Sequence, residues 1–178
     1  MRLGIAGLGK MGANIARRLR RGGIEVVAFN RSAAVTDNLV TEAGVKATYT
    51  LRQLVDALET PRVLWLMLPA GAVTQQAIDQ ILPLLSAGDV LVDGANSFYK
   101  DSMRRASTVE ATGVHYVDAG VPGGIWGLDN GYALMVGGSK AAITQLEPAI
   151  RVLAPGPTTG WLHCGPAGSG HFVAPGQV

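Results

Sequence analysis

The sequence opens with a short apolar segment that runs straight into a glycine-rich turn. Residues Arg2–Ala6 have the composition of a buried strand, and the spacing Gly7-x-Gly9-x-x-Gly12 follows at once and leads into a helix-like segment. In this context Gly7 allows a tight turn, Gly9 lets the backbone approach a pyrophosphate, and Gly12 lets the helix pack closely on the strand. Free N–H groups and the dipole at the start of the helix favour bound phosphate. The alternative is a plain glycine-rich turn.

Strand-like and helix-like segments alternate along most of the chain. Strands are expected at Arg2–Ala6, Glu25–Phe29, 62–68, 89–93 and 114–118, and helices at 11–21, after the candidate N-cap Ser32, and at 50–58, 72–85 and 100–111. Strands separated by helices of this length form a parallel sheet that is covered on both faces. The sequence therefore predicts an α/β protein with a Rossmann-type, doubly wound, mostly parallel sheet.

The composition is that of one compact globular domain. The chain has 178 residues, of which 48% are hydrophobic and only 16% charged, which disfavours disorder. No apolar run reaches the ~18 residues of a membrane-spanning helix, so no membrane partner is expected. The chain has one cysteine, Cys164, and the first strand begins without a basic leader, so a cytoplasmic protein is predicted.

Basic residues are concentrated at the start of the chain. Residues 1–31 contain Glu25 as their one acid against Arg2, Lys10, Arg17, Arg18, Arg20, Arg21 and Arg31. These cations could attract phosphates. Alternatively, four of them form the solvated face and last turn of a helix, namely Arg17, Arg18, Arg20 and Arg21. Nucleic acid is not expected as a partner, because no aromatic residues are interleaved for base stacking.

The end of the chain differs in composition from the rest. No charged residue follows Arg151, and residues 155–178 contain four prolines and six glycines. Such a composition predicts a loop or a poorly ordered tail. We therefore divide the chain into a dinucleotide-binding domain, 1–154, and a Gly/Pro-rich tail, 155–178.

The end of the second expected strand bears on the choice of dinucleotide. NAD-preferring domains place an acidic residue there, about 20 residues beyond the glycine turn, to bind the ribose 2′-hydroxyl. This chain has Asn30-Arg31-Ser32 instead. An arginine can hold a 2′-phosphate in its fork of N–H donors. The sequence thus favours NADP, with NAD as the alternative.

Four further motifs occur in order along the chain. They are Asp-Gly-Ala-Asn-Ser at 93–97, a glycine-rich run at 118–127 that leads into Trp-Gly-Leu at 126–128, Gly-Tyr-Ala-Leu-Met-Val-Gly-Gly at 131–138 and His-Cys-Gly-Pro-Ala-Gly-Ser-Gly-His-Phe-Val at 163–173. Together with the first turn they resemble the decarboxylating 6-phosphogluconate dehydrogenases, in particular the short bacterial form. The resemblance extends to Val173. It implies an NADP-dependent oxidative decarboxylation of 6-phosphogluconate to ribulose 5-phosphate, in the pentose phosphate pathway and in gluconate utilisation.

The resemblance also implies the residues of the site. Gly123-Gly124 would bring backbone N–H groups to a sugar acid phosphate, and Asn96 would lie where the nicotinamide meets that substrate. The implied cofactor-binding residues are Gly7, Leu8, Gly9, Lys10, Met11, Gly12, Asn30, Arg31, Ser32, Leu68, Pro69, Ala70 and Asn96, and the substrate-binding residues are Asn96, Pro122, Gly123 and Gly124. The family's homodimer contacts would come from a C-terminal all-helical domain, and the oligomeric state of this chain stays open.

The chain departs from the family pattern at two places. Pro122 replaces a serine that would contact the substrate, and proline offers neither a hydroxyl nor an N–H. Ala174 stands where the family has a lysine general base, and Gln177 and Val178 stand where it has a His-Asn pair. Pro175-Gly176 would also stop a helix there.

These departures predict no catalytic residue, an absent helical domain, and cofactor binding with little or no turnover. A truncation, a shifted reading frame and an engineered end are equally consistent with this ending. His115, His163 and His171 lack metal-ligand spacing, so no metal is expected. Two other functions stay open: a β-hydroxyacid dehydrogenase acting on 3-hydroxyisobutyrate or tartronate semialdehyde, and a non-catalytic dinucleotide-binding module.

Overall fold

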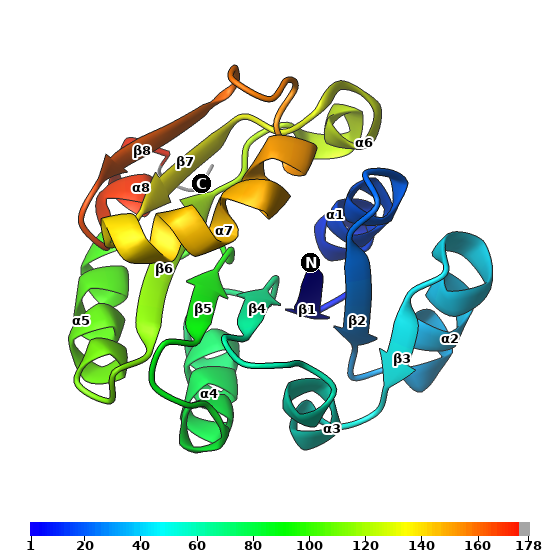
Figure 1. Ribbon diagram of the computed structural model, residues 1–178, viewed down its shortest axis with the longest axis horizontal. Coiled ribbons are helices and arrows are strands. Elements are labelled where there is room, and N and C mark those ends of the chain that lie inside the picture. The colour runs from blue at the N-terminus through cyan, green and yellow to red at the C-terminus, as the bar shows by residue number, and fades with distance from the viewer. Residues whose placement is uncertain (175–178) are drawn as a thin grey trace.

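The structure, a computed structural model, describes residues 1–174 and contains one eight-stranded sheet between two layers of helices (Figure 1). The strand order is β3-β2-β1-β4-β5-β6-β7-β8. Every neighbouring pair is parallel except β6–β7. The predicted α/β fold with a mostly parallel, doubly wound sheet is confirmed. The strands are β1 (Arg2–Ala6), β2 (Glu25–Phe29), β3 (Lys46–Thr48), β4 (Val63–Leu66), β5 (Val90–Asp93), β6 (His115–Gly120), β7 (Leu134–Gly137) and β8 (Trp161–Gly165).

Both faces of the sheet are buried, because side chains alternate between two apolar layers along each strand. In β4, Trp65 packs on the layer formed with α1, α2 and α7, whereas Leu64 and Leu66 pack on the layer formed with α3, α4 and α5. All three side chains are fully buried. The helices are α1 (Lys10–Arg21), α2 (Ala33–Ala43), α3 (Leu51–Asp56), α4 (Ala72–Ile81), α5 (Tyr99–Glu110), α6 (Gly127–Asn130), α7 (Lys140–Leu153) and α8 (Ser169–Val173), with 3-10 turns at Leu82–Leu84 and Gly124–Trp126. No helix within residues 1–174 is both long enough and apolar enough to cross a bilayer.

The interpretation of 155–178 as an irregular tail is wrong for much of that segment. Strand β8 pairs with β7 and extends the sheet, and α8 packs against β6 and β7. The buried Asp118 carboxylate holds α8, because it accepts the N–H groups of Gly168 at 2.6 Å and His171 at 2.7 Å. Glycine here permits close packing rather than disorder: a Cβ on Gly170 would lie 2.6 Å from the carbonyl oxygens of Asp118 and Met135. Assignment of this segment to the family's interdomain region stays a prediction.

Other differences from the sequence prediction are smaller. The strand β3 and the pair β7 and α7 were not predicted, and most remaining boundaries shift by one to a few residues. The expected helix stop at Pro175-Gly176 and the positions Gln177 and Val178 lie outside the described residues.

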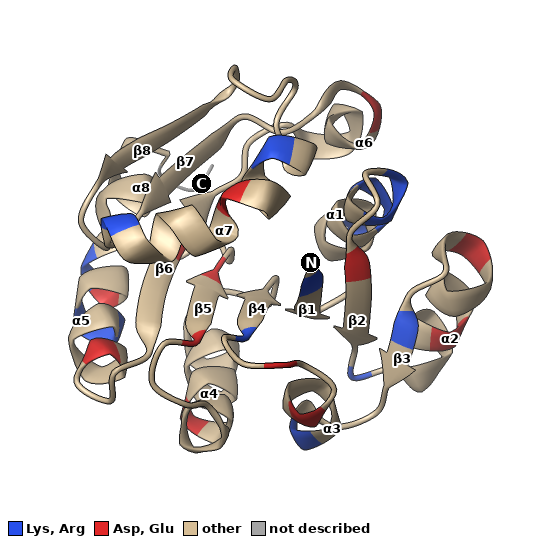
Figure 2. Ribbon diagram, in the orientation of Figure 1, with Lys and Arg blue, Asp and Glu red and all other residues tan. Residues whose placement is uncertain are grey.

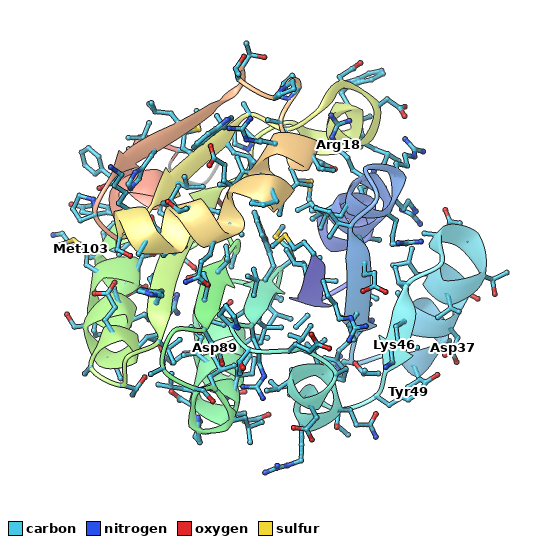
Figure 3. The ribbon with its side chains drawn as sticks, in the orientation of Figure 1. Arg18, Asp37, Lys46, Tyr49, Asp89 and Met103 are labelled. Atoms are coloured by element: carbon cyan, nitrogen blue, oxygen red, sulfur yellow. The ribbon has the colours of Figure 1, made fainter. Side chains whose placement is uncertain are left out.

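Arg18 is not the solvated residue that the helix pattern suggested. Its guanidinium donates to the carbonyl oxygens of Val152 at 2.9 Å, Leu153 at 3.0 Å, Ala154 at 2.9 Å and Leu128 at 3.1 Å. Carbonyls at the end of a helix such as α7 have no partner within the helix. Arg18 therefore supplies their donors and ties α1 to α7, as its position in Figure 3 shows.

Arg21, one turn further along α1, behaves as the pattern suggested. It donates to Asp129 at 3.0 Å, and both side chains are exposed. Figure 2 shows the basic end of α1 beside the acidic residue of α6.

Substitutions of Arg18 and Arg21 compare the contribution of a partly buried arginine that bonds the end of α7 with that of an exposed arginine on the same helix. We expect Arg18→Met to lower the free energy of unfolding by about 2–3 kcal/mol, because several partly buried carbonyls lose a charged donor. Arg21→Met should lower it by less than about 0.5 kcal/mol, as for other exposed ion pairs. Urea denaturation followed by circular dichroism measures both, and equal losses would contradict this role of Arg18.

Candidate functional site

A cleft of about 560 Å³ opens at the carboxyl ends of the central parallel strands. Strand β1 lies between β2 and β4, so the chain reverses its direction of winding there. Such a switch point is where doubly wound sheets bind ligands, and the volume is that of a small-molecule site. The cleft is lined by Gly9, Lys10, Met11, Gly12, Met67, Leu68, Gly94, Ala95, Asn96, Ala119, Gly120, Val121, Pro122, Gly123, Gly124 and Ala174.

The glycines of the first turn have three different roles. Gly7 adopts φ 98°, and a Cβ there would overlap the carbonyl oxygen of Met67. A Cβ on Gly12 would overlap the carbonyl oxygen of Gly7, so the start of α1 lies directly on the turn. Gly9 has no atom within 4 Å of the position of a Cβ. The fold therefore requires glycine at 7 and 12, whereas position 9 is open toward the cleft.

The start of α1 fits a pyrophosphate. The first helical bond runs from the N–H of Ala13 to the carbonyl of Gly9, at 2.8 Å. The N–H groups of Lys10, Met11 and Gly12 precede that bond and have no acceptor in the helix. These three residues line the cleft, so their donors and the positive end of the helix dipole suit bound phosphate.

The end of β2 lies beside the glycine turn. The side-chain oxygen of Asn30 accepts the N–H of Leu8 at 2.9 Å, which fixes the turn against the strand end. Arg31 and Ser32 are exposed. Ser32 occupies the predicted N-cap of α2, but its side chain makes no capping hydrogen bond, so its hydroxyl and the Arg31 guanidinium can serve a ligand.

The loops that follow β4 and β5 form a further part of the cleft wall, and Met67 and Leu68 lie directly against the glycine turn. Leu68 and the exposed Asn96 line the cleft. The loop of Asn96 is held by Asp93, whose carboxylate accepts the N–H of Ala95 at 3.0 Å and the hydroxyl of Ser97 at 3.0 Å. Side chains that flank a binding residue in this way keep its geometry fixed.

Several predicted residues do not line the cleft. Leu8 is buried, and Pro69 and Ala70 are exposed outside the lining. Gly7 is also buried and does not line the cleft. Residues 30–32 lie outside the lining as well, next to the turn, where Asn30 accepts the N–H of Leu8.

The loop after β6 forms the third side of the cleft. Gly123 and Gly124 adopt φ 145° and 51°, which few other residues tolerate. The fully buried Tyr132 ring supports this loop from below, with Gly123 and Gly127 against it. Pro122 is exposed and lines the cleft.

Ala174 lies on the same cleft, beside Gly120. Among the described residues of the lining, Lys10 is the one titratable side chain, and it belongs to the glycine turn. His171 is buried, and its ring lies 2.6 Å from the Ser102 hydroxyl and 3.2 Å from the carbonyl oxygen of Ala119. This histidine holds α8 in place and does not face the cleft.

Met67 lines the cleft, as expected for the family loop 67–71 that follows β4. Sequence reasoning did not assign five other lining residues to the site, namely Gly94, Ala95, Ala119, Gly120 and Val121. A signal existed: each lies at or just after the carboxyl end of β5 or β6, and the carboxyl ends of parallel strands meet at one edge of a sheet.

The arrangement of turn, strand end and cleft is matched by known proteins. Residues 2–163 match the family described as the NAD binding domain of 6-phosphogluconate dehydrogenase. The chain belongs to this family.

Relatives within the 6-phosphogluconate dehydrogenase family differ in their dinucleotide. The NADP(+)-dependent, decarboxylating enzyme of Bacillus subtilis is 36% identical over 178 residues, which cover 96% of this chain and 38% of the relative. The NAD(+)-dependent, decarboxylating enzyme of Haloferax volcanii is 41% identical over 173 residues, which cover 97% of this chain and 56% of the relative. The chain thus spans about two fifths to just over half of their length.

Solved structures show the same fold. The Plasmodium falciparum 6-phosphogluconate dehydrogenase, described in apo form, with NADP+ and with 6-phosphogluconate, superposes with a TM-score of 0.90 at 28% identity, covering 97% of this chain and 38% of that one. A Mycobacterium tuberculosis 3-hydroxyisobutyrate dehydrogenase superposes with a TM-score of 0.86 at 25% identity, covering 97% and 57%. The described residues are therefore a dinucleotide-binding domain of an oxidoreductase family.

The two glycines nearest the start of α1 should respond differently to the same added methyl group. We expect Gly9→Ala to fold with a melting temperature near that of the parent and to bind NADPH at least about tenfold more weakly, about 1.4 kcal/mol, because the methyl group projects toward the cleft. Gly12→Ala should lower the melting temperature strongly, since the methyl group meets the Gly7 backbone.

Differential scanning fluorimetry and fluorescence titration with NADPH measure the two effects. Parent-like affinity in a folded Gly9→Ala protein would contradict the placement of the pyrophosphate at this turn.

Proposed function

We propose that this chain is the cofactor domain of an NADP-dependent, decarboxylating 6-phosphogluconate dehydrogenase. The observation that carries the proposal is the cleft at the switch point, which is lined both by the start of α1, with its unpartnered N–H groups, and by the loops of Asn96 and Gly123-Gly124. Family membership supports the reaction class, since relatives with that name use NADP or NAD. A single cysteine and a family of metabolic enzymes support a cytoplasmic location.

The preference for NADP rests on the end of β2. No carboxylate is present at 30–32 to repel a 2′-phosphate. The Arg31 guanidinium and the uncapped Ser32 hydroxyl are exposed beside the turn, and an arginine fork suits a phosphate. The Asn30 side chain already holds the Leu8 N–H through its oxygen, so its part is to position the turn.

We expect NADPH to bind at least about tenfold more tightly than NADH, a difference of about 1.4 kcal/mol. Arg31→Ala should remove most of this difference and leave NADH affinity unchanged, because it deletes a 2′-phosphate contact alone. Asn30→Asp keeps an acceptor for the Leu8 N–H and adds a negative charge, so it should weaken NADPH more than NADH.

Fluorescence titration with both dinucleotides measures these differences. Equal dissociation constants of the parent chain for NADPH and NADH would refute the proposed preference.

For the substrate we propose a sugar acid phosphate held near Asn96 and Gly123-Gly124. The backbone at the two glycines allows a polyhydroxy acid to approach closely, and Asn96 offers both a donor and an acceptor. Bound NADP would supply the hydride acceptor. Removal of the substrate's hydroxyl proton needs a base, and Ala174, which lines the cleft, presents only a methyl group. Pro122 removes one further polar contact.

We therefore expect this chain to form NADPH from NADP and 6-phosphogluconate at most barely above background. A positioned base contributes about 10²–10⁴-fold to such steps, and none faces the substrate side of the cleft among the described residues. NADPH absorbance in the presence of purified protein measures this. Robust turnover would contradict the proposed role of Ala174.

The fold similarity to a 3-hydroxyisobutyrate dehydrogenase makes a short β-hydroxyacid the second candidate substrate class. A panel of 6-phosphogluconate, 3-hydroxyisobutyrate and tartronate semialdehyde, assayed with a full-length relative that carries the same cleft motifs, separates the two classes.

A further inference from the structure

Arg105 lies buried in α5 behind two of the loops that line the cleft. Its side chain is 2% exposed and uses all three guanidinium nitrogens. The Nε donates to the side chain of Gln75 at 2.9 Å, and one terminal nitrogen lies 3.2 Å from the carboxylate of Asp93 and 3.1 Å from the hydroxyl of Ser97. The other terminal nitrogen donates to the carbonyl oxygen of Gly71 at 3.2 Å.

These four partners belong to two separate segments, the loop after β4 with the start of α4 and the end of β5 with the loop that follows it. Asp93 and Ser97 lie on either side of the segment 94–96, which lines the cleft after β5. Gly71 ends the loop that begins with the lining residues Met67 and Leu68, and Gln75 lies in the first turn of α4. One planar side chain therefore joins the loop after β4 to the loop after β5.

The Asp93 carboxylate is a fixed centre for this network. It also accepts the hydroxyl of the buried Tyr116 at 2.8 Å. Burial and the neighbouring negative charge raise the pKa of Tyr116, so the phenol stays a donor. With the Ala95 N–H, the Ser97 hydroxyl and Arg105, four groups converge on one carboxylate that is fully buried.

We propose that Arg105 is a positioning residue of the cofactor site: it holds the loops 67–71 and 94–97 at a fixed separation, so that Leu68 and Asn96 meet the dinucleotide together. This inference rests on the proposed dinucleotide binding. Only an arginine reaches both loops at once, because its planar fork donates in several directions. A lysine can neutralise Asp93 but leaves Gly71 and Gln75 without their shared donor.

A second arginine–aspartate ion pair lies at the amino ends of β4 and β5, the ends far from the two loops. Arg62 precedes β4 and Asp89 precedes β5, and their charged atoms lie 3.1 Å apart. Asp89 is fully buried, and Figure 3 shows it at the start of β5, away from the cleft. This pair stabilises the sheet without touching a loop that lines the site, so it controls for a loss of stability alone.

The test compares Arg105→Lys with Arg62→Lys in the full 178-residue chain. We expect both variants to lower the melting temperature. Arg105→Lys should raise the dissociation constant for NADPH about tenfold, the order of effect expected when the support of a binding group is lost. Arg62→Lys should leave it within about twofold of the parent. Amide hydrogen exchange in 67–71 should accelerate only in Arg105→Lys.

Each outcome decides the inference. Parent-like affinity of a folded Arg105→Lys protein, or an equal loss of affinity in Arg62→Lys, would overturn it. If Arg105→Lys fails to fold, Gln75→Leu decides, since it keeps the Asp93–Arg105 pair and removes the acceptor of the Arg105 Nε, which orients the guanidinium toward Gly71: weaker NADPH binding supports the inference and parent-like binding overturns it. A parent chain that binds neither NADPH nor NADH would instead refute the proposed function, and this inference with it.

Discussion

The close approach of backbones at the carboxyl end of β1 is the constraint on which the rest of this structure depends. At Gly7 the turn touches the carbonyl of Met67 after β4, and at Gly12 the start of α1 touches the turn itself. No side chain fits between these segments. Their contact brings the N–H groups of α1 to the edge where β4 and β5 end, and the cleft exists because that edge is also the point at which the sheet reverses its winding.

Buried charged groups hold the elements around this turn. Arg18 supplies donors to the end of α7, Asp118 accepts the N–H groups at the start of α8, and Arg105 joins the loops after β4 and β5. In each case a charged side chain bonds backbone groups of a distant segment. Buried polar groups need such partners, so each charge ties two segments of the fold together.

Family membership shows the type of domain, whereas the proposed choice of dinucleotide and substrate depends on individual side chains. The family establishes a dinucleotide-binding domain, and relatives that use NADP and NAD share the same fold. The proposed preference for NADP rests on a few atoms at 30–32, and the proposed loss of turnover rests on the methyl group of Ala174. Both Pro122 and Ala174 line the cleft.

The sequence by itself determined the α/β class, the first two strands with their bounds and the glycine turn that lines the cleft, because local periodicity and glycine spacing act over a few residues. Only the tertiary structure decided that 161–173 forms a strand and a helix, that Arg18 is a helix cap, and that Arg105 links two loops of the cleft. These features depend on partners far away in the chain: Arg105 meets Gly71 and Gln75 across some thirty residues, and Arg18 meets Val152 across more than a hundred. Composition and spacing carry no signal for such contacts, since they arise only when the strands are paired and the helices packed.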